Sequence, residues 1–213
     1  MNELKDLLEK VKAEAPLTLV ITNQVTVGDC ANALLALGAA PVMSDDPADA
    51  RDLAAVASAT VLNIGTVGEP QLEVLLAAGH WAKKSGRPVV LDPVGAGATA
   101  TRLAASERLL KETSPDIIRG NLSEIKALAG LKGGQRGVDS APAAGDDLAG
   151  VAALAGDLAG RRGAVVAVTG ATDVVAAAGR TWFVSGGSPL LTRLTGTGCL
   201  LSALTGAYAA AAG

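Results

Sequence analysis

Short apolar runs alternate along this chain with longer segments in which apolar and polar residues repeat at helical spacing. The apolar runs are rich in valine, leucine and isoleucine, which is typical of buried strands. They cover residues 16–22, 40–43, 60–65, 88–95, 116–121 and 164–170. The alanine- and leucine-rich segments predict helices over residues 1–16, 28–38, 44–58, 69–86, 101–113, 122–130, 146–163 and from 199 onward.

The alternation of strands with crossover helices predicts an α/β fold with a mainly parallel sheet covered by helices on both faces. The last two apolar runs, residues 173–179 and 180–187, instead resemble a hairpin around Ala178-Gly179. Residues 132–146 are poor in apolar side chains and are predicted to form a loop. The chain therefore has the pattern of one α/β domain.

Most of the unusual polar residues follow the predicted strands directly. In open α/β sheets, ligands bind at the carboxyl ends of the strands. We therefore expect these strand ends to form one site: Thr22, Asn23, Met43, Ser44, Asn63, Ile64, Gly65, Thr66, Asp92, Pro93, Arg119, Gly120, Asn121, Thr169 and Gly170.

The stretch LTGTGCLLSAL begins with glycines and delivers Cys199 to the start of an apolar helix. Glycines allow a tight turn, and unpaired N–H groups at the helix start stabilise an anion. The segment Gly196, Thr197, Gly198 is therefore a candidate anion site beside Cys199. The alternative is a glycine turn next to a buried, inert cysteine.

Three further residues are candidates for holding phosphate or a metal ion. Arg119 ends a strand and suits a phosphate group, and Asp92 is a carboxylate that would be costly to bury without a partner. Glu124, at the third helical position after Asn121, could serve Mg²⁺ or could close a helix-capping box. Asp92 could equally be a cap or turn residue.

Composition narrows the function classes. The chain has 213 residues, a net charge of −3 and 2% aromatic residues. It has no run of lysine and arginine to bind the phosphates of nucleic acid, and few aromatic side chains on which bases could stack. Two distant cysteines are expected to stay reduced. The N-terminal segment lacks the apolar core of a signal peptide, and no apolar run suffices for a membrane span. We expect a soluble cytoplasmic protein that does not bind membranes.

An ordered set of motifs closely resembles the hydroxyethylthiazole kinase family of the ribokinase-like superfamily. These are ITNQVTVGDCANALLALGAAPVMSDDP, VLNIGT, VVLDPVGAGAT, IIRGNLSEIKALAG, GVDS, VVAVTGATDVV and GSPLLTRLTGTGCLLSAL. They run in order from about residue 17 to residue 206. The sequence GTGC separates this family from most relatives, which carry an aspartate where Cys199 stands.

The resemblance implies a three-layer α/β/α fold, often a homotrimer with sites between subunits. It implies transfer of the ATP γ-phosphoryl group to the hydroxyl of 4-methyl-5-(2-hydroxyethyl)thiazole, with Mg²⁺, in thiamine salvage. Roles implied by the matching positions are thiazole contacts at Asn23, Met43, Gly65, Thr66 and Gly196; ATP contacts at Arg119 and Thr169; a Mg²⁺ and phosphate network at Asp92, Asn121 and Glu124; and catalysis at Gly196, Thr197, Gly198 and Cys199. Cys199 would accept the hydroxyl proton or only position the alcohol.

This chain differs from the family pattern at Gly28, where asparagine is usual, and at Leu19-Val20, where a histidine is common. Family members usually continue with further helices, so we expect a single ribokinase-like domain over residues 1–213 that lacks them. Two other functions stay open. One is a related enzyme for another substrate, such as a hydroxymethylpyrimidine kinase or a repair dehydratase for hydrated nicotinamide cofactors. The other is a non-catalytic thiazole- or nucleotide-binding protein.

Overall fold

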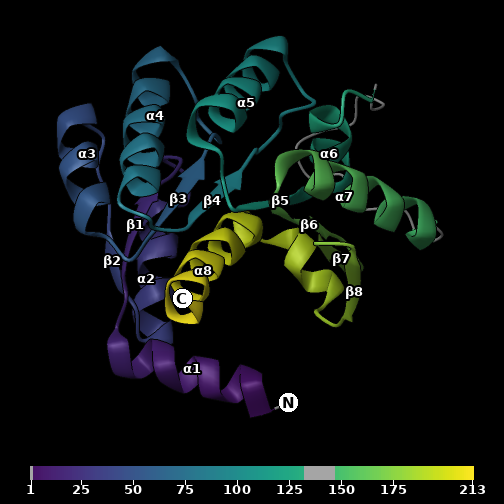
Figure 1. Cartoon of the computed structure of the whole chain (residues 1–213), viewed down its shortest axis with the longest axis horizontal. Coiled ribbons are helices and arrows are strands. Elements are labelled where there is room, and N and C mark those ends of the chain that lie inside the picture. The colour runs from purple at the N-terminus through teal and green to yellow at the C-terminus, as the bar shows by residue number, and fades with distance from the viewer. Residues whose placement is uncertain (1, 132–146) are drawn as a thin grey trace.

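The computed structural model describes residues 2–131 and 147–213, which form one eight-stranded sheet with helices on both sides (Figure 1). The strands are β1 (Leu17–Ile21), β2 (Ala40–Val42), β3 (Ala59–Asn63), β4 (Val89–Asp92), β5 (Ile117–Asn121), β6 (Val165–Thr169), β7 (Thr172–Ala177) and β8 (Arg180–Ser185). The helices are α1 (Asn2–Glu14), α2 (Val27–Leu37), α3 (Pro47–Val56), α4 (Glu69–Lys84), α5 (Ala100–Thr113), α6 (Leu122–Leu128), α7 (Leu148–Arg162), the 3₁₀ helix η1 (Pro189–Arg193) and α8 (Thr197–Ala212). The loop predicted over 132–146 and the GVDS motif lie outside the described residues.

The sheet has the strand order β2-β1-β3-β4-β5-β6-β7-β8. The pairs from β2 to β6 are parallel, and β7 and β8 are added antiparallel. Ala178 and Gly179, with φ of 46° and 76°, turn the chain between β7 and β8. Two consecutive residues with positive φ suit a tight hairpin turn. The predicted α/β class, the parallel sheet and the hairpin around Ala178-Gly179 are confirmed.

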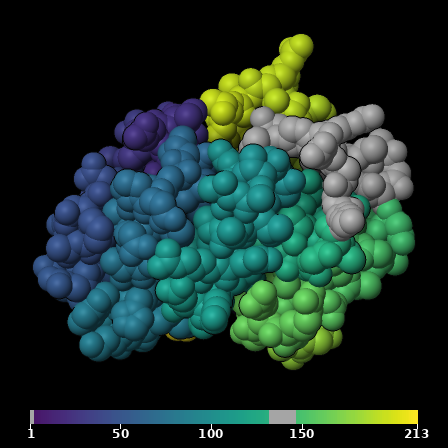
Figure 2. Space-filling view, turned by 90° about the horizontal axis from the view of Figure 1, so that it is seen from above, coloured from purple at the N-terminus to yellow at the C-terminus, as the bar shows by residue number. Residues whose placement is uncertain are grey.

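The two faces of the sheet have separate apolar cores. Side chains of α3, α4, α5 and α7 pack with alternate strand residues such as Leu62, Leu91 and Ile118. The outer surfaces of α3, α4 and α5 form one continuous side of the molecule (Figure 2). Side chains of α1, α2 and α8 pack on the other face against Val61 and Val90. Because successive side chains of a strand point to opposite faces, the same strands contribute residues to both cores.

The described helices do not cover both faces along the whole sheet. Among the described helices on the second face, α8 packs on β1, β3 and β4. All six residues of β8 are exposed, with Trp182 at 47% and Val184 at 54%. In the part of the chain that the structure describes, β8 is therefore an exposed edge, because α8 packs on β1, β3 and β4 instead. The layered fold is confirmed for the central strands.

Local chemistry sets several element boundaries. The Asp46 side chain accepts hydrogen bonds from the N–H groups of Ala48 and Asp49 and so caps α3. The strand predicted over 88–95 ends earlier, at Asp92, because Pro93 follows and Gly95 adopts a φ of 68°. Over residues 2–131 and 147–213, no helix has the length and apolar character needed to cross a membrane.

Candidate active site

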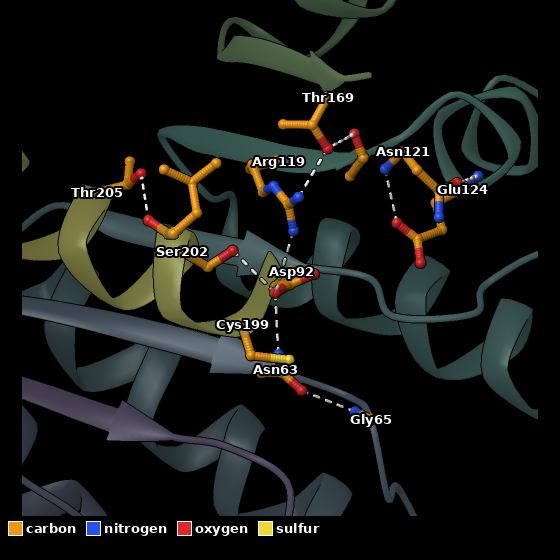
Figure 3. A network of polar contacts seen from close by, with 12 residues as sticks. Asn63, Gly65, Asp92, Arg119, Asn121, Glu124, Thr169, Cys199, Ser202 and Thr205 are labelled. Carbon is orange, nitrogen blue, oxygen red and sulfur yellow. Dashed lines mark hydrogen bonds and ion pairs between the residues drawn. The ribbon is translucent and has the colours of Figure 1, made fainter. Parts of the chain in front are cut away.

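The carboxyl ends of the central strands meet the N-terminal end of α8 in one polar cluster (Figure 3). Asn23, in the loop before α2, joins this cluster. The cluster contains Asn23, Asn63, Asp92, Arg119, Thr169, Cys199 and Ser202. Two of its hydrogen-bonded members, Asn23 and Cys199, are 176 positions apart in the chain. Five of the predicted strand-end residues, Asn23, Asn63, Asp92, Arg119 and Thr169, therefore lie together, and their role as one binding site stays a prediction.

Asp92 is the buried charge of this cluster. Its Oδ2 accepts hydrogen bonds from Asn63 Nδ2 at 2.9 Å and from Ser202 Oγ at 2.8 Å, and lies 3.8 Å from Arg119 Nη1. Its Oδ1 has no hydrogen-bond partner among the described residues. Burial raises the pKa of the Asp92 carboxyl above its ordinary value, although Arg119 and the two hydrogen bonds oppose that shift. A buried carboxylate with an oxygen that lacks a hydrogen-bond partner is suited to binding a cation.

Arg119 and Thr169 lie together, as predicted. Arg119 Nη2 donates to Thr169 Oγ1 at 2.7 Å, and the Thr169 hydroxyl lies 3.3 Å from the carbonyl oxygen of Gly120. The Nε of Arg119 is buried and has no partner among the described residues. The guanidinium therefore keeps unused hydrogen-bonding capacity, which suits a phosphate oxygen.

The glycine turn before α8 is held between α2 and Arg119. Gly196 has a φ of 80°, and a Cβ there would lie 2.3 Å from Thr26 Cγ2. A Cβ on Gly198 would lie 2.6 Å from Arg119 Nη1. Because the first N–H groups of a helix lack intrahelical partners, this turn combines amide donors with a nearby guanidinium. That combination favours an anion, as the sequence predicts.

On the α2 side, Asn23 links the turn to the end of β3. Its Nδ2 donates to Asn63 Oδ1 at 3.1 Å and to Cys199 Sγ at 3.3 Å. Gly65 lies so close that a Cβ there would be 2.8 Å from Asn23 Cβ. Thr66 Oγ1 accepts from the Gln24 N–H at 3.4 Å. The structure therefore brings together the predicted thiazole contacts Asn23, Gly65 and Thr66 beside Cys199.

Met43 differs from the other predicted thiazole contacts. It follows the edge strand β2 and is half-buried against the apolar core that α1, α2 and α8 share with the sheet. A lone methionine is commonly a core residue, and this packing agrees with that alternative. Its predicted contact with the thiazole stays a prediction.

Asn121 and Glu124 form the capping box that the sequence offered as one alternative. Asn121 Oδ1 accepts from the Glu124 N–H at 2.9 Å, and Glu124 Oε2 accepts from the Asn121 N–H at 2.8 Å. Glu124 Oε1 also accepts from the Gly95 N–H at 2.8 Å, which ties α6 to the turn after β4. Burial, followed by the charge of Asp92, raises the Glu124 pKa to about 7 despite these hydrogen bonds.

The raised pKa of Glu124 predicts a pH-dependent stability. Between its ordinary value of 4.5 and about 7, the folded chain binds more protons at Glu124 than the unfolded chain does. The free energy of unfolding should therefore fall as pH rises through this window, by roughly 3 kcal/mol for a shift of this size. Urea denaturation of the ligand-free protein between pH 5 and 7.5 measures the slope. Glu124→Gln should flatten it, and an equal slope in that variant would contradict the assignment.

The acidic residues fit a Mg²⁺ ion that arrives with phosphate rather than one held by the protein alone. In the part of the chain that the structure describes, no three acidic, histidine or cysteine side chains gather as a metal site. Mg²⁺ commonly uses one or two carboxylates, with waters and substrate phosphates completing its shell. The unpartnered Oδ1 of Asp92 would provide such a carboxylate oxygen, and Glu124 is the neighbouring carboxylate.

Sequence reasoning missed two residues that organise this cluster. Ser202 lies on α8 three residues after Cys199, and this spacing was its only signal. Arg102 on α5 donates to the carbonyl oxygens of Val94 at 2.7 Å and Gly65 at 2.6 Å. It thus joins the loops after β3 and β4. Asn63 was expected only as one of many strand-end residues.

Comparison with known proteins identifies close relatives. A model described as the hydroxyethylthiazole kinase family matches residues 8–213. A hydroxyethylthiazole kinase of Alkaliphilus oremlandii (strain OhILAs) is 44% identical over 206 residues, which are 97% of this chain and 75% of that protein. One from Nitratidesulfovibrio vulgaris (strain DP4) is 48% identical over 202 residues, 95% of this chain and 74% of that protein.

Solved structures agree with this similarity. The hydroxyethylthiazole kinase structure from Pyrococcus horikoshii OT3 has a TM-score of 0.88 and 40% identity, and the match covers 99% of this chain and 77% of that one. A Bacillus subtilis pyridoxal kinase in complex with ADP has a TM-score of 0.64 at 17% identity, covering 92% of this chain and 84% of that one. The latter likeness supports the shared ribokinase-like fold.

Proposed function

Because this chain belongs to the hydroxyethylthiazole kinase family, we propose that it transfers the γ-phosphoryl group of ATP to the hydroxyl of 4-methyl-5-(2-hydroxyethyl)thiazole. The observation that carries the proposal is the position of the glycine turn. The turn stands between Arg119 on one side and the Asn23–Cys199 contact on the other. Phosphate would bind on the first side and the alcohol on the second.

Phosphoryl transfer depends mainly on positioning and charge stabilisation. The alcohol oxygen attacks the γ-phosphorus and forms the new O–P bond, while the bond from that phosphorus to the ADP oxygen breaks. The hydroxyl proton passes to an oxygen of the transferred phosphoryl group or to water. The amides from Gly196 to Cys199 would stabilise the equatorial oxygens, as an anion hole does. Arg119, supported by Thr169, would bind the phosphate groups of the nucleotide. Asp92 and Glu124 would hold Mg²⁺, which when bound supplies positive charge to the phosphates.

Cys199 is proposed to lie beside the alcohol and to position it. Its thiol already accepts a hydrogen bond from Asn23 and is buried. Cysteine is a weak base toward a primary alcohol, so positioning is the role we favour.

Cys199→Ala should therefore keep most of the turnover. We expect kcat to fall less than about 10-fold, below the 10²–10⁴-fold range that is typical for loss of a general base. Steady-state kinetics, with KM for the alcohol measured separately, test this. A fall of kcat within that larger range at unchanged KM would favour the base role instead.

A coupled ADP-release assay with the thiazole alcohol, ATP and Mg²⁺ tests the function. Turnover of this alcohol in preference to hydroxymethylpyrimidine supports the proposal, and the opposite preference supports the related-kinase alternative. Binding of the alcohol or ATP without turnover supports a non-catalytic protein.

The proposal includes a homotrimer in the cytoplasm. Exposed apolar residues flank α2, with Val25 at 64% just before its start and Leu35 at 60% in its last turn, and they suit a subunit contact along this helix. Two buried free thiols suit a reducing compartment. Light scattering that finds a stable monomer would contradict the shared-site arrangement.

A further inference from the structure

Ser202 is fully buried on α8, and the mechanism above gives it no role. Its hydroxyl donates to a side chain outside its own helix, which is unusual for a serine inside a helix. A buried hydroxyl inside a helix commonly donates to the carbonyl four residues earlier. Among the described residues, three other helical hydroxyls donate to the carbonyl four residues earlier: Thr205 to Leu201 O, Thr113 to Leu109 O, and Ser106 to Arg102 O. Ser202 instead donates across to Asp92 Oδ2 at 2.8 Å (Figure 3).

This hydrogen bond acts together with that of Asn63 to fix the Asp92 carboxylate. Both donors and the guanidinium of Arg119 face Oδ2, and Oδ1 is left without a partner among the described residues. Rotation of the carboxylate would break both hydrogen bonds inside a buried site, which is costly. The two donors therefore decide which oxygen stays open.

Asp92 and Arg119 do not close to hydrogen-bond distance. Their closest atoms are 3.8 Å from each other, whereas the exposed pairs Arg51–Asp52 and Arg108–Glu112 close to 2.8 and 2.9 Å. A charge-assisted pair normally closes to about 2.8 Å when nothing opposes it. If this pair closed, the carboxylate and the guanidinium would bind each other, and neither would be available to another ligand.

We propose that Ser202 is a positioning residue that, with Asn63, holds Asp92 away from Arg119 so that the carboxylate stays available to Mg²⁺ and the guanidinium to the nucleotide's phosphates. This inference rests on the proposed kinase function. It requires the Ser202 hydroxyl to act only through Asp92. Removal of that hydroxyl should weaken Mg²⁺–nucleotide binding and leave alcohol binding unchanged.

Ser202→Ala tests this with the removal of one oxygen atom. Titration calorimetry should show Mg²⁺–ADP affinity falling by about 10-fold to 100-fold, the range for loss of a residue that orients a metal ligand. The Mg²⁺ concentration for half-maximal turnover should rise in parallel, and KM for the alcohol should not change. Thr205→Val is the matched control one turn away: its exposed hydroxyl bonds its own helix, so Mg²⁺–ADP affinity should match that of the parent.

A double-mutant cycle with Asp92→Asn separates positioning from a general structural effect. In the Asp92→Asn background, Ser202→Ala should change Mg²⁺–ADP affinity less than about 2-fold if the serine acts through Asp92. The same loss in both backgrounds, or parent-like affinity in Ser202→Ala, overturns the proposal. Thermal melting of each variant confirms that folded protein is compared. If the parent binds Mg²⁺–ADP but does not phosphorylate the alcohol, the proposed function fails, and the binding cycle still decides the role of Ser202.

Discussion

Replacing Asp92 by asparagine is expected to abolish most phosphoryl transfer and to raise the melting temperature of the chain. Turnover should fall by about 10²–10³-fold, the range for removal of one preorganised electrostatic group. The loss has a direct cause: an amide oxygen at this position could still accept from Asn63 and Ser202, but it would bring no negative charge to Mg²⁺.

The gain in stability follows from the raised pKa of Asp92. Burial outweighs the opposing effect of Arg119, so the folded state favours the uncharged form of this side chain. Above the ordinary carboxyl pKa, the ionised group therefore costs stability, and asparagine removes that cost. Each kcal/mol recovered should raise the melting temperature by about 2–4 °C in a chain of this size.

Differential scanning calorimetry at pH 7 and the ADP-release assay measure both effects of Asp92→Asn. Asp52→Asn, which removes an exposed carboxylate on α3, is the control and should change neither quantity appreciably. A lower melting temperature for Asp92→Asn would mean that its ion pair with Arg119 outweighs desolvation. Turnover within 10-fold of the parent would remove Asp92 from the proposed mechanism.

Gly198→Ala should disable the site with little effect on folding. The added methyl group would lie 2.6 Å from Arg119 Nη1 and 3.1 Å from Nη2, so the guanidinium must move. Because that group is the end of a flexible side chain, the backbone of α8 can stay in place. The displaced arginine would lose its bond to Thr169, and kcat/KM for ATP should fall by about 10²-fold or more, as for loss of an oriented phosphate contact.

The chain offers a matched control for this substitution. Gly28 is the second residue of α2, as Gly198 is of α8, but a Cβ there would meet nothing within 4 Å. Gly28→Ala should keep parent kinetics and stabilise the protein by about 0.5–1 kcal/mol, the usual gain for alanine over glycine in a helix. Equal kinetics in the two variants would show that the close approach of Gly198 to Arg119 has no functional role.

Much of the site could be predicted because its residues directly follow strands that the apolar pattern identifies. The pattern placed four residues at one edge of the sheet: Asn23, Asp92, Arg119 and Thr169. Their strands are β1, β4, β5 and β6; the last three are neighbours in the sheet, and only β3 separates them from β1. The Asn121–Glu124 capping box was also predictable, since its partners are three residues apart. Met43 was harder, because one methionine after a strand suits a ligand contact and a core position equally.

The sequence alone determined the order of strands and helices, the terminal hairpin and the convergence of polar strand ends, because these depend on periodicity and on chemistry within a few residues. Tertiary structure alone decided which atoms meet. Ser202 and Asp92 are 110 positions apart, and their hydrogen bond exists because α8 crosses β3 and β4. The exposed β8 edge has the same origin, since the path of α8 across the sheet leaves that strand uncovered. Such contacts depend on how distant elements pack, and no local pattern encodes that packing.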